Sequence, residues 1–137
     1  MPDVFSKEVR SRVMSRIRSR DTKPEMLVRK LAHALGFRFR LHRRDLLGCP
    51  DLVFPRRRKI IFVHGCFWHM HEGCRKCRMP KSNRSYWRSK LLLNRDRDRR
   101  NKEALESLGW RIMVVWECEV KDIGKLKKRL TAFLGRD

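Results

Sequence analysis

Acidic side chains and long apolar runs are what this sequence has least of. Its 137 residues include only 15 Asp and Glu against 36 Lys and Arg. No apolar run approaches the ~20 residues that span a bilayer, and the first residues lack the apolar core of a signal peptide. We therefore expect a protein that neither spans a membrane nor is exported, and that works in the cytoplasm.

The net charge of the chain is therefore strongly positive, with a formal value of +21 at pH 7. Lys and Arg release condensed counterions when they meet phosphates, so this charge indicates a nucleic acid partner. A hydrophobic fraction of 41% is ordinary for a folded protein and argues against a disordered polybasic tail. Because no internal repeat or linker divides the chain, we expect one domain over residues 1–137.

Hydrophobic periodicity predicts the element order α, α, β, β, β, α, β, α. Three consecutive strands can form a meander, and a long helix then returns the chain to a fourth strand by a right-handed crossover. The expected fold class is α/β, with a mixed four-stranded sheet flanked by helices. The expected helices cover 6–20, 22–35, 85–108 and the residues after 122, and the expected strands cover 37–41, 51–54, 60–63 and 111–116.

A group of strong metal ligands lies in the irregular segment 64–84. Five cysteines without an export signal favour metal ligation or buried thiols over disulfides. Thiolates and imidazole are the ligands that zinc selects, so a structural site of three cysteines and one histidine is expected, with unligated reduced cysteines as the alternative. The candidate ligands number five for the four places of such a site: Cys66, His71, Cys74, Cys77 and Cys118.

Four side chains near these elements are candidates for hydrolytic chemistry. Asp51 follows a Gly-Cys-Pro turn, where a carboxylate could hold Mg²⁺, although a turn-capping role explains this residue alone at least as well. His64 or His69, if left over beside a metal site, suits a general acid or base, and the alternative is a solvated loop residue. Glu25 is fully explained as part of a capping box with Thr22.

Large aromatic residues stand between the metal-binding candidates. Phe67 and Trp68 are adjacent in the loop and surrounded by positive charge, which suits stacking on bases or wedging between them; packing under the loop is the alternative. The long helix carries a stripe that is apolar at both ends and polar in the middle, as expected of a helix that crosses a DNA groove or an active site. The stripe comprises Trp87, Leu91, Asn94, Asp98, Asn101, Leu105 and Leu108.

Taken together, the motifs closely resemble the very short patch repair (Vsr) DNA mismatch endonuclease family. The resemblance implies a restriction-endonuclease-like αβββαβ core. It also implies an enzyme that nicks duplex DNA 5′ to the thymine of a T·G mismatch, the product of 5-methylcytosine deamination. The matching segments are Gly48-Cys-Pro-Asp51-Leu-Val, Phe62-Val-His-Gly-Cys-Phe-Trp-His69-Met-His71, Met79-Pro-Lys-Ser82, Tyr86-Trp87, Asn94, Arg97-Asp-Arg-Arg100 and Leu108 to Cys118.

The resemblance implies roles for individual active-site residues. Asp51 and the main-chain carbonyl of Val63 match the ligands of a catalytic Mg²⁺. His69 matches the general base that activates water. His64 and Glu25 match residues that support the phosphate and metal-bound water.

The resemblance also assigns the zinc and DNA contacts. Cys66, His71, Cys74 and Cys118 match the structural Zn²⁺ set, with Cys77 as the alternative to Cys74. Phe67, Trp68 and Trp87 match aromatic residues that wedge into DNA beside the mismatch. The basic segment 1–20, including Met14, matches an arm that clamps the opposite groove.

Two positions depart from the pattern of the family. A known family member has Thr at the position of Val63; Val63 keeps the main-chain carbonyl as a ligand but lacks the hydroxyl. Cys49 stands where Arg is more usual. The implied partners are double-stranded DNA with a T·G mismatch and mismatch-repair proteins, and the implied state is a monomer at the bacterial nucleoid. A zinc-stabilised nucleic-acid-binding module without catalysis and a nicking nuclease of different specificity are the competing hypotheses.

Overall fold

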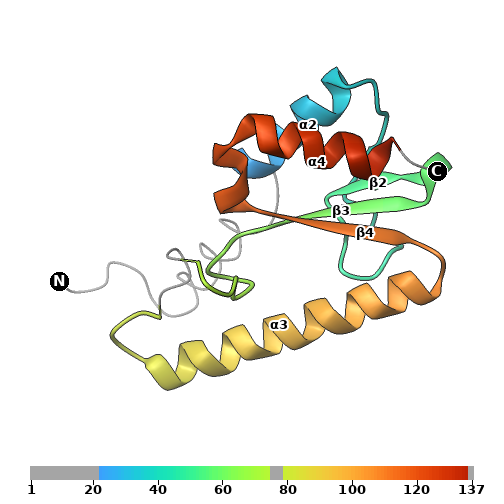
Figure 1. Ribbon diagram of the computed structural model, residues 1–137. Helices are drawn as coiled ribbons and strands as arrows, with labels where there is room; N and C mark the ends of the chain where they lie inside the picture. The colour runs from blue at the N-terminus through green and yellow to red at the C-terminus, as the bar shows by residue number, and fades with distance from the viewer. Residues whose placement is uncertain (1–21, 75–78, 136–137) are drawn as a thin grey trace.

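The described part of the chain opens with helix α2 (Lys23–Ala34) in a computed structural model that describes residues 22–74 and 79–135 (Figure 1). The hydroxyl of Thr22 accepts a hydrogen bond from the Glu25 backbone N–H at 3.3 Å, as an N-cap residue does. Gly36, with a φ of 94°, then turns the chain toward the sheet. The expected helix 6–20 lies outside the described residues.

The sheet has four strands in the order β1-β2-β3-β4. The neighbours β1 (Arg40–Leu41), β2 (Leu52–Phe54) and β3 (Lys59–His64) pair antiparallel, and β4 (Arg111–Trp116) lies parallel to β3. The meander and the crossover to a parallel strand are therefore confirmed, as is the mixed four-stranded sheet. The short 3₁₀ helix η1 (Pro55–Arg57) makes the turn between β2 and β3.

The expected strand 37–41 is wrong in its extent, because only Arg40 and Leu41 pair with β2. β2 ends at Phe54, since the next residue is Pro55, which has no N–H to extend the ladder. The residues before Arg40 instead pack on the core as irregular chain, and the Phe39 ring meets the Phe54 ring edge-on at 5.6 Å. The Leu41 side chain is 41% exposed.

Helices cover both faces of the sheet (Figure 1). α2 and α4 (Ile123–Leu134) lie on one face, and α3 (Arg84–Ser107) runs along the other. β3 is buried on both sides, as its continuous apolar run predicts: Ile61 joins the cluster with α2 and α4, whereas Ile60 and Phe62 join the cluster with Leu105 of α3. The carboxylate of Asp122 caps α4 by accepting from the Lys125 N–H at 3.0 Å.

The polar-centred stripe of α3 is present over most of its expected length. Leu91, Asn94 and Leu105 are buried, and Asp98 is half-buried between them. Leu108 was wrongly included: α3 ends at Ser107, and this side chain is 62% exposed. No helix in the described ranges combines the length and apolar character needed to cross a membrane.

Candidate active site

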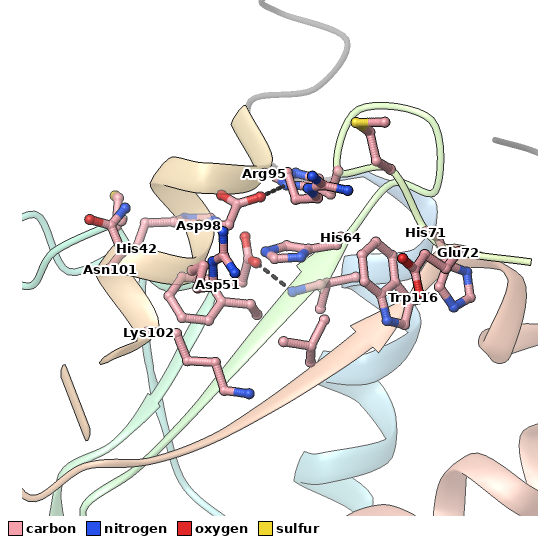
Figure 2. A pocket seen from close by; sticks show the side chains of 18 of the residues that line it. His42, Asp51, His64, His71, Glu72, Arg95, Asp98, Asn101, Lys102 and Trp116 are labelled. Atoms are coloured by element: carbon pink, nitrogen blue, oxygen red, sulfur yellow. Dashed lines mark hydrogen bonds and ion pairs between the residues drawn. The ribbon is translucent and has the colours of Figure 1, made fainter. Parts of the chain in front are cut away.

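A cavity of about 800 Å³ lies where the parallel strands β3 and β4 end. The strand-end residues His64 and Trp116 line it, together with the middle of α3 and the segment that precedes β2. Asp51, His64 and Asp98 come from different elements and point toward one another (Figure 2). The structure therefore brings the two sequence candidates Asp51 and His69 to one cavity.

Asp51 is held at the point where β2 and β3 separate. Backbone pairing between these strands ends at Leu52 and Ile61, and the Asp51 carboxylate accepts the next free amide, the Val63 N–H, at 2.7 Å (Figure 2). Burial raises the pKa of Asp51 to about 6, opposed by this hydrogen bond and by nearby cationic side chains. Burying a carboxylate costs free energy, and a role in holding a cation accounts for that cost. A turn-capping role does not require the carboxylate to be buried.

Glu25 faces this site as well and is only 2% exposed. Its carboxylate accepts from Arg29 and hydrogen-bonds the His42 ring at 2.9 Å, so the capping box with Thr22 does not explain it completely. One ligand atom each from Glu25, His42 and Asp51 lies within 4.8 Å of the others. Sequence reasoning missed His42, whose only signal was a polar position beside the first expected strand.

Two histidine rings that line the cavity lie stacked on each other. The His64 and His69 ring centroids are 3.8 Å apart at an interplanar angle of 7°. Burial lowers the pKa of His64 to about 3, so this imidazole is neutral at physiological pH. A neutral, fixed imidazole can donate one hydrogen bond without adding charge to the cavity.

His69 has a partner that the sequence did not single out as catalytic. Its Nδ1 hydrogen-bonds the Asp98 carboxylate, which α3 projects from the polar middle of its stripe. Because Nδ1 faces a carboxylate, the ring proton belongs on Nδ1 and the Nε2 lone pair is available to accept a proton. The arrangement is that of a base with its orienting carboxylate.

The four cysteine and histidine candidates in the described residues also meet, with their ligand atoms within 4.8 Å of one another: Cys66, His71, Cys74 and Cys118. The Nδ1 of His71 lies 3.6 Å from the Cys66 Sγ and 3.5 Å from the Cys118 Sγ. Bonds of about 2.3 Å to sulfur and 2.0–2.1 Å to nitrogen in a tetrahedron require an N···S separation of about 3.6 Å. The donor set therefore fits a tetrahedral metal, whereas the alternative ligand Cys77 lies outside the described residues.

The loop aromatics form a cluster of their own. The rings of Phe67, Trp68 and Trp87 lie 5.1 to 5.9 Å apart, centroid to centroid, and all three are half-buried. They belong to neither of the two core clusters. Asn94 of α3 donates to the Trp68 carbonyl at 3.4 Å, which fastens the loop to the helix. The rings thus pack on one another beside the cavity.

Comparison with known proteins identifies the family of this chain. The family model of the DNA mismatch endonuclease Vsr matches residues 2–76. The chain is 40% identical to the DNA mismatch endonuclease Vsr of Escherichia coli K12, over 92% of this chain and 80% of that protein. The chain belongs to the Vsr DNA mismatch endonuclease family. It is thus a DNA-cleaving hydrolase, and a binding module without catalysis does not describe it.

Other relatives of this Vsr-family chain are named as nicking enzymes. It is 53% identical to the Type II nicking enzyme V.XorIIP of Xanthomonas oryzae pv. oryzae, over 98% of each chain. It is 43% identical to the Type II nicking enzyme V.NmeAIP of Neisseria meningitidis, over 95% of this chain and 92% of that protein. The family assignment therefore rests on matches that extend over nearly the whole length.

Basic side chains outnumber acidic ones on the walls of the cavity of this Vsr-family endonuclease. Four basic side chains line its walls: Arg44, Arg95, Arg99 and Lys102. Cys49, which departs from the family pattern, is exposed and also lines the cavity. The departure therefore lies where a substrate would pass. Met14 lies outside the described residues.

Proposed function

We propose that this Vsr-family endonuclease makes a Mg²⁺-dependent single-strand nick 5′ to the thymine of T·G mismatches that arise from 5-methylcytosine deamination. The observation that carries the proposal is the convergence of Asp51 and the His69–Asp98 pair on one basic cavity. Two of the three aromatic rings, Phe67 and Trp68, lie on the same loop as His69, so base-pair disruption and hydrolysis can occur side by side. A monomer of one domain, acting at the bacterial nucleoid and alongside mismatch-repair proteins, suits this role.

The ligands of Mg²⁺ would be the Asp51 carboxylate and the Val63 carbonyl, with Glu25 close enough to bind its waters. When bound, Mg²⁺ supplies the Lewis acid that polarises the phosphoryl oxygen. His69 takes the proton of the attacking water at Nε2, and the Asp98 carboxylate stabilises the imidazolium that results. Neutral His64 donates to a phosphate oxygen.

A structural Zn²⁺ would be held by Cys66, His71, Cys74 and Cys118. Four protein ligands close the coordination sphere, so this metal braces the loop and does not take part in hydrolysis. Burial raises the pKa of the Cys66 and Cys118 thiols, and a bound metal reverses this by favouring the thiolates. The brace fixes both His69 and the aromatic rings.

Phe67, Trp68 and Trp87 are the proposed wedge into the duplex. A T·G wobble is weakly stacked, so unstacking it costs less than unstacking a matched pair. Three rings already packed on one another lose little freedom on insertion. We also propose that residues 1–20, with Met14, form the arm that holds the opposite groove.

The experiment that tests the proposal incubates the protein with Mg²⁺ and an end-labelled duplex that carries one T·G pair. We expect a nick 5′ to the thymine on that strand alone, and far slower cleavage of matched duplexes and of other mismatches. Asp51→Ala should abolish the nick without loss of duplex binding. Failure of folded, zinc-loaded protein to nick the T·G duplex would refute the proposal.

A nicking nuclease of different specificity is the second candidate, favoured by the names of V.XorIIP and V.NmeAIP. It predicts nicking of an undamaged recognition site at a rate that a T·G pair does not raise. The same set of duplexes, with varied flanking bases, distinguishes the two functions.

Salt should weaken duplex binding steeply, because the net charge of +21 implies many phosphate contacts. Raising monovalent salt about fourfold should cost roughly 10³-fold in affinity if six or more phosphates are neutralised. Fluorescence anisotropy with a labelled duplex measures the slope. A flat response would contradict an electrostatic mode of binding.

Removing one cluster ligand should release the structural metal. Cys118→Ser is expected to reduce bound zinc to near zero, because one lost thiolate opens the tetrahedral site. Metal analysis by mass spectrometry after gel filtration measures the stoichiometry. Cys49→Ser is the matched control and should retain its zinc, since Cys49 lies outside the cluster. Full zinc in the Cys118 variant would exclude Cys118 as a ligand.

A further inference from the structure

The parallel strands β3 and β4 end side by side, and each is followed at the same spacing by a candidate zinc ligand. His64 of β3 and Trp116 of β4 are direct neighbours in the strand register. The four residues proposed to hold zinc, Cys66, His71, Cys74 and Cys118, are called the metal cluster below. Two of them lie two residues beyond these strand ends: Cys66 after His64 and Cys118 after Trp116. The metal cluster therefore lies immediately beyond the residue pair that borders the catalytic cavity.

Aromatic rings connect the metal cluster to the catalytic histidines without a break. His71 and Trp116 stack at a centroid distance of 4.2 Å and an interplanar angle of 7°. Trp116 meets the His64 ring edge-on at 5.3 Å and 73°, and His64 stacks on His69 at 3.8 Å. Trp116 lies between His64 and His71 and lines the cavity (Figure 2).

We propose that Trp116 is a positioning residue that couples the metal-bound His71 to the orientation of His64 and His69. This inference rests on the proposed function, because it takes His69 as the residue that acts on DNA. A metal at His71 fixes one end of the ring series, and the indole transmits that fixed orientation to the imidazoles.

The surroundings of Trp116 support positioning over general core packing. Trp116 is half-buried and belongs to neither core cluster. Its backbone N–H donates to the Glu119 carboxylate at 2.9 Å, and the Cys66 N–H donates to Glu117 at 3.0 Å, so both strand ends are anchored. The indole therefore projects from a fixed point into the space between the metal cluster and the cavity.

Replacing the indole tests the coupling. Trp116→Leu should keep its zinc and its affinity for a T·G duplex, yet slow single-turnover nicking by roughly 10- to 100-fold, as loss of a residue that orients a reactive group does. Trp116→Phe retains a ring and should recover most of that loss. Trp110→Phe is the matched control, since Trp110 precedes the other end of β4 in a core cluster, and should nick at the wild-type rate.

A second variant separates the ring from the metal. His71→Cys converts the cluster into a site of four cysteines, which still binds zinc tetrahedrally but offers Trp116 no imidazole. We expect full zinc and slower nicking. Zinc-loaded His71→Cys protein that nicks at the wild-type rate would overturn the proposal, whether or not the Trp116 variants fold.

Histidine ring signals in ¹H–¹³C spectra provide a readout that does not depend on cleavage. The His64 and His69 signals, assigned by replacing each ring in turn, should shift in His71→Cys, which leaves the Trp116 indole and its ring current in place, but not in Trp110→Phe. Unmoved signals in zinc-loaded His71→Cys protein would refute the coupling even if nicking slowed. If the wild type proves not to nick T·G duplexes, the proposed function fails, while these shifts still decide the coupling.

Discussion

Asp98→Asn should slow nicking by about 10²- to 10⁴-fold, the range seen when a base loses its orienting carboxylate. The Asp98 carboxylate hydrogen-bonds the Nδ1 of His69, which leaves Nε2 unprotonated. An amide in its place can donate to Nδ1, which favours the wrong ring tautomer and no longer stabilises the imidazolium. Single-turnover assays with protein in excess over a T·G duplex measure the chemical step.

Asp96→Asn is the matched control for this experiment. Asp96 lies on the same helix and pairs with Arg99, and it is not among the residues that line the cavity. Its neutralisation changes the net charge by the same amount, so any effect of overall charge on DNA binding appears in both variants.

In a His69→Ala background, Asp98→Asn should have no further effect, since the two residues act as a unit. A large additional loss there would mean that Asp98 acts on something other than His69.

Local patterns were enough to predict most of the fold. The cap at Thr22, the strand over 60–63 and the long helix that begins near residue 85 each depend on neighbours in the chain, and all three are present. The extent of β1 was not predictable in this way. It depends on which residues pair with the short partner strand β2, so the alternation of residues 37–41 could not reveal it.

The candidate site, too, could be predicted from the sequence only where its residues lie in local motifs. Asp51 and His69 lie in recognisable motifs, whereas Asp98 and His42 do not. Asp98 is 29 residues from His69, and His42 is 17 residues from Glu25. Each contact arises from how α2 and α3 pack against the sheet and the loop, and no local spacing encodes that packing. A charged residue interrupting the apolar stripe of α3 was the one available signal for Asp98.

Asp51→Asn should abolish nicking and at the same time stabilise the protein in buffer without added Mg²⁺. Burial raises the pKa of Asp51 from 3.8 to about 6, and a change of that size corresponds to about 3 kcal/mol. Asn is of similar size, and its oxygen can still accept from the Val63 N–H. The variant therefore keeps the contact and loses the cost of a buried charge, which should raise the Tm by several degrees.

The gain in stability from Asp51→Asn should change with pH in a direction that can be checked. Because the folded-state pKa is raised, the folded protein holds the Asp51 proton more tightly than the unfolded chain does, and wild-type stability falls as pH rises from about 4 through about 6. The two proteins should thus be equally stable near pH 4 and differ most near pH 8, as measured by urea unfolding. Zinc release at acidic pH affects both alike and cancels in the difference.

Added Mg²⁺ completes the test of Asp51, because a cation that binds only the folded state stabilises it by mass action. The wild type should gain stability on titration with Mg²⁺ at about pH 8, and Asp51→Asn should gain little, so the gap between them narrows. Equal gains in both proteins would place the cation elsewhere. A variant less stable than the wild type at every pH would mean that the Asp51 charge is already balanced by His42 and Arg29, and the carboxylate would then not be poised to receive a metal.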